Sequence, residues 1–168
     1  MSLKSLCEEY GIKDYSINID GSIDVFDTVT INRCNISVLP INFRKVYGHF
    51  NCYSNKLTTL KNSPQFVYGD FICSWNKLTN LKGGPVEVTG DFYCHYNKLT
   101  SIKKGPIKLR GNFFTNKLKI KELQYDTSGF ISSVKNYNNL IKKRQRKKIL
   151  NKLLNKWYNL YIKIFYNV

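Results

Sequence analysis

The 168-residue sequence lacks any long uncharged apolar stretch and contains no alanine. A membrane-spanning helix needs about 20 consecutive apolar residues, so the absence of such a run predicts that there is no transmembrane segment. The first residues, MSLKSLCEEYG, have neither a basic start nor a long apolar run, and we expect no secretory signal peptide. The five cysteines are an odd number without CxxC spacing, which predicts neither a disulfide framework nor a zinc finger and favours a reducing, cytoplasmic location.

Acidic residues are unevenly distributed along the chain, which carries a formal net charge of +16. Residues 1–30 contain six Asp or Glu, whereas residues 128–168 contain ten Lys or Arg and no acidic residue. The C-terminal quarter is therefore a separate electrostatic unit, suited to an acidic partner or surface.

The central part of the sequence is a repeat with a period of 21 residues. Residues 46–108 contain three consecutive copies, VYGHFNCYSNKLTTLKNSPQF, VYGDFICSWNKLTNLKGGPVE and VTGDFYCHYNKLTSIKKGPIK. Weaker copies precede and follow them, which gives five predicted coils. A fixed period of this length is typical of a solenoid, in which each coil buries its apolar side against a neighbour. The columns in register include Val46/Val67/Val88, Gly48/Gly69/Gly90, Phe50/Phe71/Phe92, Cys52/Cys73/Cys94, Asn55/Asn76/Asn97 and Leu57/Leu78/Leu99.

Each copy predicts one strand, running from the glycine column to the asparagine column. Alternation along this strand sends Phe50 and Cys52 into the core and His49, Asn51 and Tyr53 to the concave face. The asparagine column is expected to form a ladder of side-chain bonds to neighbouring backbone groups. The Pro- and Gly-rich segments SPQF, GGPVE and KGPIK are too short for helices, so the convex side is expected to be extended or turn-like.

Written from Tyr47, the copy YGHFNCYSNKL resembles the leucine-rich-repeat pattern LxxLxLxxNxL, with aromatic and Cys residues at Leu positions. The resemblance covers roughly residues 25–120. The short coil is similar to repeats of bacterial secreted effectors and of proteins encoded by tailed phages and other large viruses. It implies a curved sheet of parallel strands and a chain that binds and inhibits a host protein, such as a defence component, in the host cytoplasm. The catalytic ubiquitin-ligase domain that such effectors often carry would not fit in the remaining residues, so that activity is not expected.

Two flanking segments are expected to close the ends of the repeat. Ser2 can cap a short helix that stops at Gly11, and Asp20-Gly21 between alternating apolar residues predicts a hairpin turn with both residues at positive φ. The predicted fold is a mainly β repeat solenoid, a curved leucine-rich-repeat sheet with an N-terminal helix-hairpin cap and a C-terminal α-helical cap. We divide it into the N-terminal cap (1–24), five repeats (25–127) and a basic amphipathic helical segment (128–168).

No arrangement of residues predicts a catalytic, metal or cofactor site. The Cys52/Cys73/Cys94 column would space its sulfurs about 5 Å apart, and because no His pair lies nearby, buried free cysteine is the simpler interpretation. Cys94 and His95 lie on opposite faces of one strand and cannot form a dyad. The column of His49, Asp70 and Asp91 allows a His–carboxylate contact. No nucleophile or phosphate-binding loop accompanies it, which favours a solvated polar ladder.

Several concave positions carry aromatic side chains, the residue types that anchor protein interfaces. The alternative is that these positions drift freely in a Tyr-rich chain. We predict a protein-binding face made of His49, Asn51, Tyr53, Asp70, Ile72, Trp75, Asp91, Tyr93, His95, Tyr96 and Phe114.

The basic C-terminal segment has three interpretations, which are not mutually exclusive. It can cap the last coil with Leu150, Leu153, Leu154 and Trp157, or lie on a membrane surface through its aromatic end. It can also bind nucleic acid by charge, which is the main alternative function. The residues expected to contact phosphates are Lys142, Lys143, Arg144, Arg146, Lys147, Lys148, Lys152 and Lys156. The sequence leaves the identity of the partner and the oligomeric state open.

Overall fold

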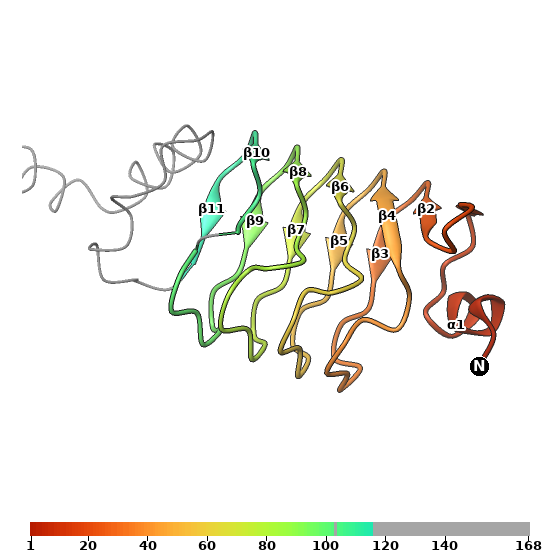
Figure 1. Cartoon of the computed structure of the whole chain (residues 1–168), viewed down its shortest axis with the longest axis horizontal. Coiled ribbons are helices and arrows are strands. Elements are labelled where there is room, and N and C mark those ends of the chain that lie inside the picture. The colour runs from red at the N-terminus through yellow and green to blue at the C-terminus, as the bar shows by residue number, and fades with distance from the viewer. Residues whose placement is uncertain (103, 116–168) are drawn as a thin grey trace, which may run out of the picture.

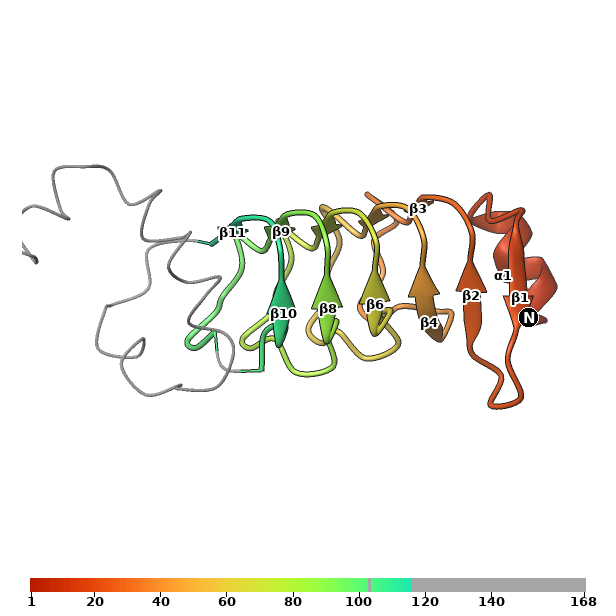
Figure 2. The ribbon, with the colours of Figure 1, turned by 90° about the horizontal axis from the view of Figure 1, so that it is seen from above.

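The computed structural model describes residues 1–102 and 104–115, which form a parallel β-solenoid preceded by a short helix, α1 (Leu3–Glu9) (Figure 1). The six-stranded sheet holds, in spatial order, β1 (Tyr15–Ile17), β2 (Ile23–Val25), β4 (Phe43–Val46), β6 (Phe66–Val67), β8 (Glu87–Val88) and β10 (Lys108–Leu109). The five-stranded sheet holds β3 (Val29–Thr30), β5 (Phe50–Asn51), β7 (Phe71–Ile72), β9 (Phe92–Tyr93) and β11 (Phe113–Phe114). Seen from above, the coils form a single row from the N-terminal cap to β11 (Figure 2).

The register of the five-stranded sheet follows the sequence period. Val29 pairs with Phe50, and each later strand pairs in parallel with the residue 21 positions further on, as far as Phe113. These four pairings correspond to about four turns of the solenoid. The predicted fifth copy is described only as far as Thr115.

The core lies between the two sheets and is built from the predicted columns. The rings of the Phe column are fully buried and stack with centroids 5.0–5.5 Å apart, in the order Phe50, Phe71, Phe92 and Phe113. Cys52, Cys73 and Cys94 are buried beside them. Because each ring covers the next, the coils bury apolar surface against one another along the whole stack, as the period predicts.

The asparagine column forms the predicted ladder. Asn76 accepts a hydrogen bond at Oδ1 from the Leu57 N–H (2.9 Å) and donates from Nδ2 to the carbonyls of Cys52 (3.0 Å) and Cys73 (3.1 Å). The other two members of the column make equivalent bonds. One side chain thus satisfies backbone groups in two successive coils, at a corner where no strand pairing is available.

The side of the coils predicted to be convex is more regular than the sequence indicates. The return segments are extended, as expected, but they also pair in parallel through β4, β6, β8 and β10 to build most of the six-stranded sheet. The strands of the five-stranded sheet are correspondingly shorter than predicted, with two residues each. Each coil therefore has two short strands joined by corners.

The pattern LxxLxLxxNxL aligns Tyr47 with its first Leu position, but in the structure the buried residue at this corner is the valine before it. Tyr47 and Tyr68 are 43% and 48% exposed, whereas the preceding Val46 and Val67 are buried. Side chains alternate along an extended chain, so the residue that follows a buried valine at the corner faces outward.

The N-terminal helix begins and ends near the predicted residues. Ser2 Oγ accepts a hydrogen bond from the Ser5 N–H (3.1 Å), which caps the helix, and Gly11 takes a positive φ of 66° just beyond its end. Cys7 is buried on the side that faces the core.

The hairpin forms between β1 and β2, but with a longer loop than predicted. Ile17 pairs with Ile23, which leaves five residues, 18–22, in the loop. Gly21 alone in this loop takes a positive φ (78°). Asp20 instead accepts a hydrogen bond from the Ser22 N–H (3.0 Å), a local turn that competes with the two-residue hairpin.

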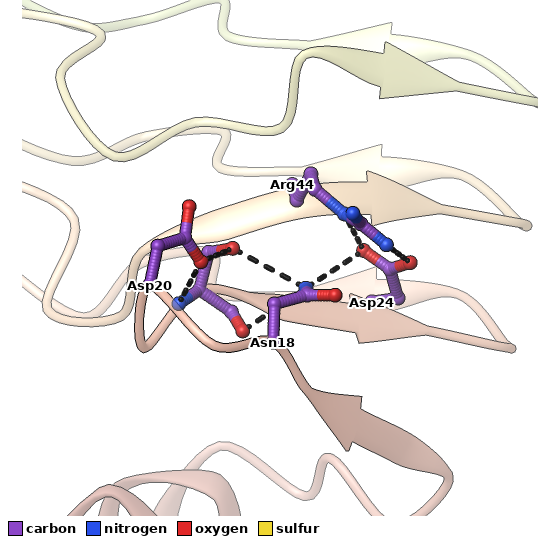
Figure 3. Close-up of polar contacts among 5 residues, drawn as sticks. Asn18, Asp20, Asp24 and Arg44 are labelled. Carbon is purple, nitrogen blue, oxygen red and sulfur yellow. Dashed lines mark hydrogen bonds and ion pairs between the residues drawn. The ribbon is translucent and has the colours of Figure 1, made fainter.

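A polar network joins the hairpin to the first coil (Figure 3). Arg44 on β4 donates from Nε (2.8 Å) and Nη2 to the two carboxylate oxygens of the buried Asp24 on β2. Asn18 donates to the same carboxylate (3.2 Å) and to Ser22. The bonds from Arg44, followed by that from Asn18, lower the pKa of Asp24, so the charged pair fixes the cap against the solenoid.

The C-terminal helical cap predicted for residues 128–168 lies outside the described residues. Among residues 1–102 and 104–115, no helix has the length and apolar character needed to cross a membrane.

Candidate interaction surface

The outward side of the five-stranded sheet, with the turns that end its strands, corresponds to the predicted concave face. We call it the aromatic face. It carries all eleven residues of the predicted protein-binding face, although most of them are partly buried rather than fully exposed. Its character changes along the stack, because the first coils present polar groups and the later coils present rings.

The column of His49, Asp70 and Asp91 is a ladder of bonds between coils. The Asp70 N–H donates to His49 Nδ1 (3.0 Å), and the Asp91 N–H donates to Asp70 Oδ1 (2.7 Å). The Asn112 N–H donates in turn to Asp91 Oδ1 (2.7 Å). The His49 Nδ1 atom also lies 3.3 Å from Asp70 Oδ2, so the predicted His–carboxylate contact is present. Each side chain satisfies backbone of the next coil, which is a structural role.

Tyr93 is fixed in place by two neighbours. Its hydroxyl donates to Asp91 Oδ2 (2.9 Å), and its ring stacks on Phe114 with centroids 4.6 Å apart and an interplanar angle of 7°. Burial, followed by the bond to Asp91, raises the pKa of Tyr93 to about 12. The phenol therefore stays neutral at physiological pH and presents a rigid aromatic surface.

His95 contacts Ser74 rather than Cys94. The Ser74 Oγ and His95 Nδ1 atoms lie 3.1 Å apart, while the His95 ring meets the rings of Tyr93 and Tyr96 edge-on. Burial lowers the pKa of His95. Ser74 is completely buried, so its hydroxyl is closed to an external substrate. This Ser–His pair packs the aromatic face and does not form an accessible nucleophile.

Among the Trp, Tyr and Phe rings of the aromatic face, Trp75 and Tyr96 are the most exposed, at 49% and 57%. Their centroids lie 4.4 Å apart. Both residues take left-handed backbone conformations, with φ of 57° and 54°, in a column that they share with Arg33 and Ser54. That conformation costs a residue other than glycine about 1–2 kcal/mol. Gly or Asn would adopt this backbone conformation at a lower cost in free energy, so packing alone does not explain why large rings occupy these two positions.

The N-terminal part of the aromatic face is more polar and includes Arg33. The Arg33 guanidinium lies over the Tyr53 ring, 5.9 Å from its centroid, and Asn51 Oδ1 accepts a hydrogen bond from the Tyr53 N–H (3.0 Å). Ile72 follows Asn51 in the same column and is half-buried. The aromatic cluster is thus confined to the later coils, around Tyr93.

A second aromatic ladder was missed in the sequence. Phe26, Tyr47 and Tyr68 stack along the corner between the two sheets, with centroids 5.3 and 4.9 Å apart, and all three rings are 43–48% exposed. These residues lie 21 positions apart, so the repeat period was the signal that could have revealed them.

The cysteine column has the environment of a packed core. Burial raises the pKa of the Cys52 and Cys94 thiols to about 12, so both stay protonated. Within the described part of the chain, no group of three or more His, Cys, Asp or Glu residues is arranged to hold a metal ion. The basic residues between 142 and 156 lie outside that part.

The aromatic face is therefore a rigid surface with exposed and half-buried rings and with its polar groups largely bonded within the sheet. Such a surface can bind another molecule by shape and apolar contact. Comparison with protein-family models, curated proteins and solved structures finds no match for this chain.

Proposed function

We propose that this chain is a non-catalytic interaction module of the leucine-rich-repeat type, which binds a protein partner through the aromatic face. The observation that supports this most strongly is the cluster of Trp75, Tyr93 and Tyr96, two of which are held at strained backbone positions while half of their surface stays in water. Aromatic residues on a rigid scaffold are the usual anchors of protein interfaces. The surface would bind by occlusion, covering a functional site of its partner.

Rigidity favours this mechanism. The rings of the aromatic face contact one another, and Tyr93 is bonded to Asp91, so little side-chain entropy remains to be lost on binding. Association is opposed mainly by the loss of translational, rotational and side-chain entropy, and by polar groups that lose water without gaining a good partner. A preformed surface therefore needs only a few anchors. By the resemblance of its coils, the first partners to test are cytoplasmic host proteins, including defence components.

Replacing Trp75 and Tyr93 together by Ala should weaken partner capture on the order of 100-fold. Two anchor residues that contribute about 1.4 kcal/mol each account for that factor. The measurement is affinity capture with the full chain as bait, followed by titration of the captured protein against both forms. Circular dichroism melts of the two forms establish that the fold persists.

The matched control is the double variant Y47A/Y68A. It removes two rings from the corner ladder, whose exposure is close to that of Trp75, and leaves the rings of the aromatic face in place. We expect it to capture the partner as well as the unsubstituted chain does. Capture that survives W75A/Y93A, or that is lost equally in Y47A/Y68A, would refute the assignment of the aromatic face.

Nucleic-acid binding through residues 142–156 is the second candidate function. It is favoured by the charge of the C-terminal quarter, which has ten Lys or Arg and no acidic residue. Contacts of this kind depend steeply on salt because they release counterions from the phosphates.

A further inference from the structure

The corner opposite the glycine column carries a ridge of lysines. In each of the three clear copies one lysine directly follows the ladder asparagine. A second lysine follows it five residues later in the first two copies, and Lys104 follows Lys98 six residues later in the third. In the described residues the side chains of the ridge are all exposed. We call this the lysine ridge; its members are Lys56, Lys61, Lys77, Lys82, Lys98 and Lys104.

Backbone bonds place the lysines of successive coils side by side. The Lys77 N–H donates to the Leu57 carbonyl (2.8 Å), and the Lys98 N–H donates to the Leu78 carbonyl (2.9 Å). Neighbouring extended chains in such a stack lie about 4.8 Å apart. Lys56, Lys77 and Lys98 therefore form one row of like charges at the spacing of the coils.

The charges of the ridge are not neutralised within the described part of the chain. Three acidic residues, Asp70, Glu87 and Asp91, follow residue 28 in the described part of the coils. Asp70 and Asp91 bond to backbone next to the glycine corner, and Glu87 lies on β8, where it pairs with Lys108 (3.5 Å). No ion pair in this part of the chain involves a ridge lysine. Like charges at this spacing repel one another, so the row disfavours folding slightly and attracts an anionic ligand.

The ridge adjoins the exposed ring pair of the aromatic face. Trp75 precedes Lys77 by two residues, and Tyr96 precedes Lys98 by two, so rings and cations alternate along the same edge of adjacent coils. Proteins that bind single-stranded nucleic acid without sequence preference combine these two elements, a cationic row for phosphates and aromatic rings for bases. We propose that the lysine ridge, with Trp75 and Tyr96 at its border, is a binding site for single-stranded nucleic acid.

The uncharged residues of the ridge favour nucleic acid over a lipid surface. Thr58, Thr79 and Thr100 lie between the two lysine rows and are exposed, as is Asn80. Hydroxyl and amide groups bond to phosphate and sugar oxygens. A membrane-surface helix or edge would instead need apolar side chains between its cations. This site goes beyond the protein-binding function proposed above, since it shares Trp75 and Tyr96 with the aromatic face but is built on lysines that are not part of that face.

The test is the triple variant K56Q/K77Q/K98Q in the full chain. Binding to a fluorescein-labelled oligodeoxythymidylate of about 20 nucleotides is followed by anisotropy at several salt concentrations. Three lost phosphate contacts should make the slope of log affinity against log salt shallower by about 2, and should weaken binding on the order of 100-fold at about 0.1 M salt. The melting temperature should stay the same or rise, because the variant removes like-charge repulsion.

The matched control is K4Q/K13Q/K108Q, which removes the same charge from exposed positions away from the ridge. Residues 142–156 are unchanged in both variants, so their contribution to affinity cancels. Loss in the ridge variant with near-normal binding in the control supports the site. The proposed site is overturned if the two variants lose affinity for the oligonucleotide equally or if neither loses affinity. It is also overturned if the unsubstituted chain does not bind at low salt. The proposal is also overturned if the ridge variant binds the oligonucleotide normally and loses only its binding to phosphatidylserine vesicles.

A second measurement reports on the rings. The chain has two tryptophans, Trp75 and Trp157, so the variant W157F leaves Trp75 as the single indole. Stacking of a base on this ring should quench its fluorescence as the oligonucleotide is added. When K56Q/K77Q/K98Q is added to W157F, half-maximal quenching should need a higher oligonucleotide concentration, by the same factor as the loss of affinity seen by anisotropy. Unquenched Trp75 fluorescence at saturation would contradict the stacking half of the proposal.

Discussion

Replacing Gly69 by Ala should lower the free energy of unfolding by about 3 kcal/mol, the upper range for overpacking a closely packed site. A Cβ atom at this position would lie 2.9 Å from the carbonyl carbon and oxygen of Gly48 and from the His49 nitrogen. These are backbone atoms of the preceding coil, so no side-chain rotation can relieve the overlap. The same column continues at Gly90, whose N–H donates to the Gly69 carbonyl (3.0 Å), and the strain would reach the following coil too.

Urea denaturation followed by far-ultraviolet circular dichroism measures this loss. The control is Gly21→Ala in the hairpin loop, where φ is +78° but no atom lies within 4 Å of the added Cβ. That variant should lose only about 1 kcal/mol, from backbone strain alone. A Gly69→Ala protein as stable as the unsubstituted chain would show that the coils are not packed as closely as described.

Replacing Asn76 by Ala should cost about 3 kcal/mol. The side chain is 7% exposed and satisfies the Leu57 N–H together with the carbonyls of Cys52 and Cys73. Each buried group that loses its partner costs about 1–3 kcal/mol, and water can reach only part of this corner. The effect should be cooperative, because the three groups belong to two coils.

The control for Asn76→Ala is Asn80→Ala in the same coil. Asn80 is exposed, and its Oδ1 accepts a single local bond from the Lys82 N–H (3.0 Å). Its loss should change the free energy of unfolding by no more than about 0.5 kcal/mol. Equal effects of the two substitutions in urea denaturation would mean that the asparagine ladder does not stabilise the solenoid.

The features that repeat in the sequence were the ones that could be predicted from it. The 21-residue period gave the solenoid, the buried Phe column and the asparagine ladder, because one local rule applies to every coil. The helix cap at Ser2 is also local and formed as predicted. The six-stranded sheet could not be predicted from the sequence in the same way. Its two-residue strands, such as Phe66–Val67, owe their conformation to pairing with the next coil rather than to their own Pro- and Gly-rich sequence.

The candidate site was predicted less completely than the fold. The period placed Tyr93 and Phe114 in one column, but nothing in their sequence shows the bond from Tyr93 to Asp91. The left-handed conformation of Trp75 and Tyr96 is also invisible in the sequence, since neither residue type favours positive φ. Neighbouring coils impose that conformation through the stacked corner.

The hairpin loop differed from the prediction for a related reason. The hydrogen bond from the Ser22 N–H to Asp20 stabilises a local turn that the Asp-Gly pair alone does not predict.

Access to the aromatic face is tested most directly by placing a photo-crosslinking residue on it. With p-benzoylphenylalanine in place of Tyr93 in the full chain, irradiation in the presence of the captured partner should join the two proteins. The same residue in place of Gln65, which is exposed next to the six-stranded sheet, should give little or no product. Crosslinks from position 93 that lead only into residues 116–168 of the chain itself, or equal yields from both positions, would contradict the proposal that this face is open to a partner.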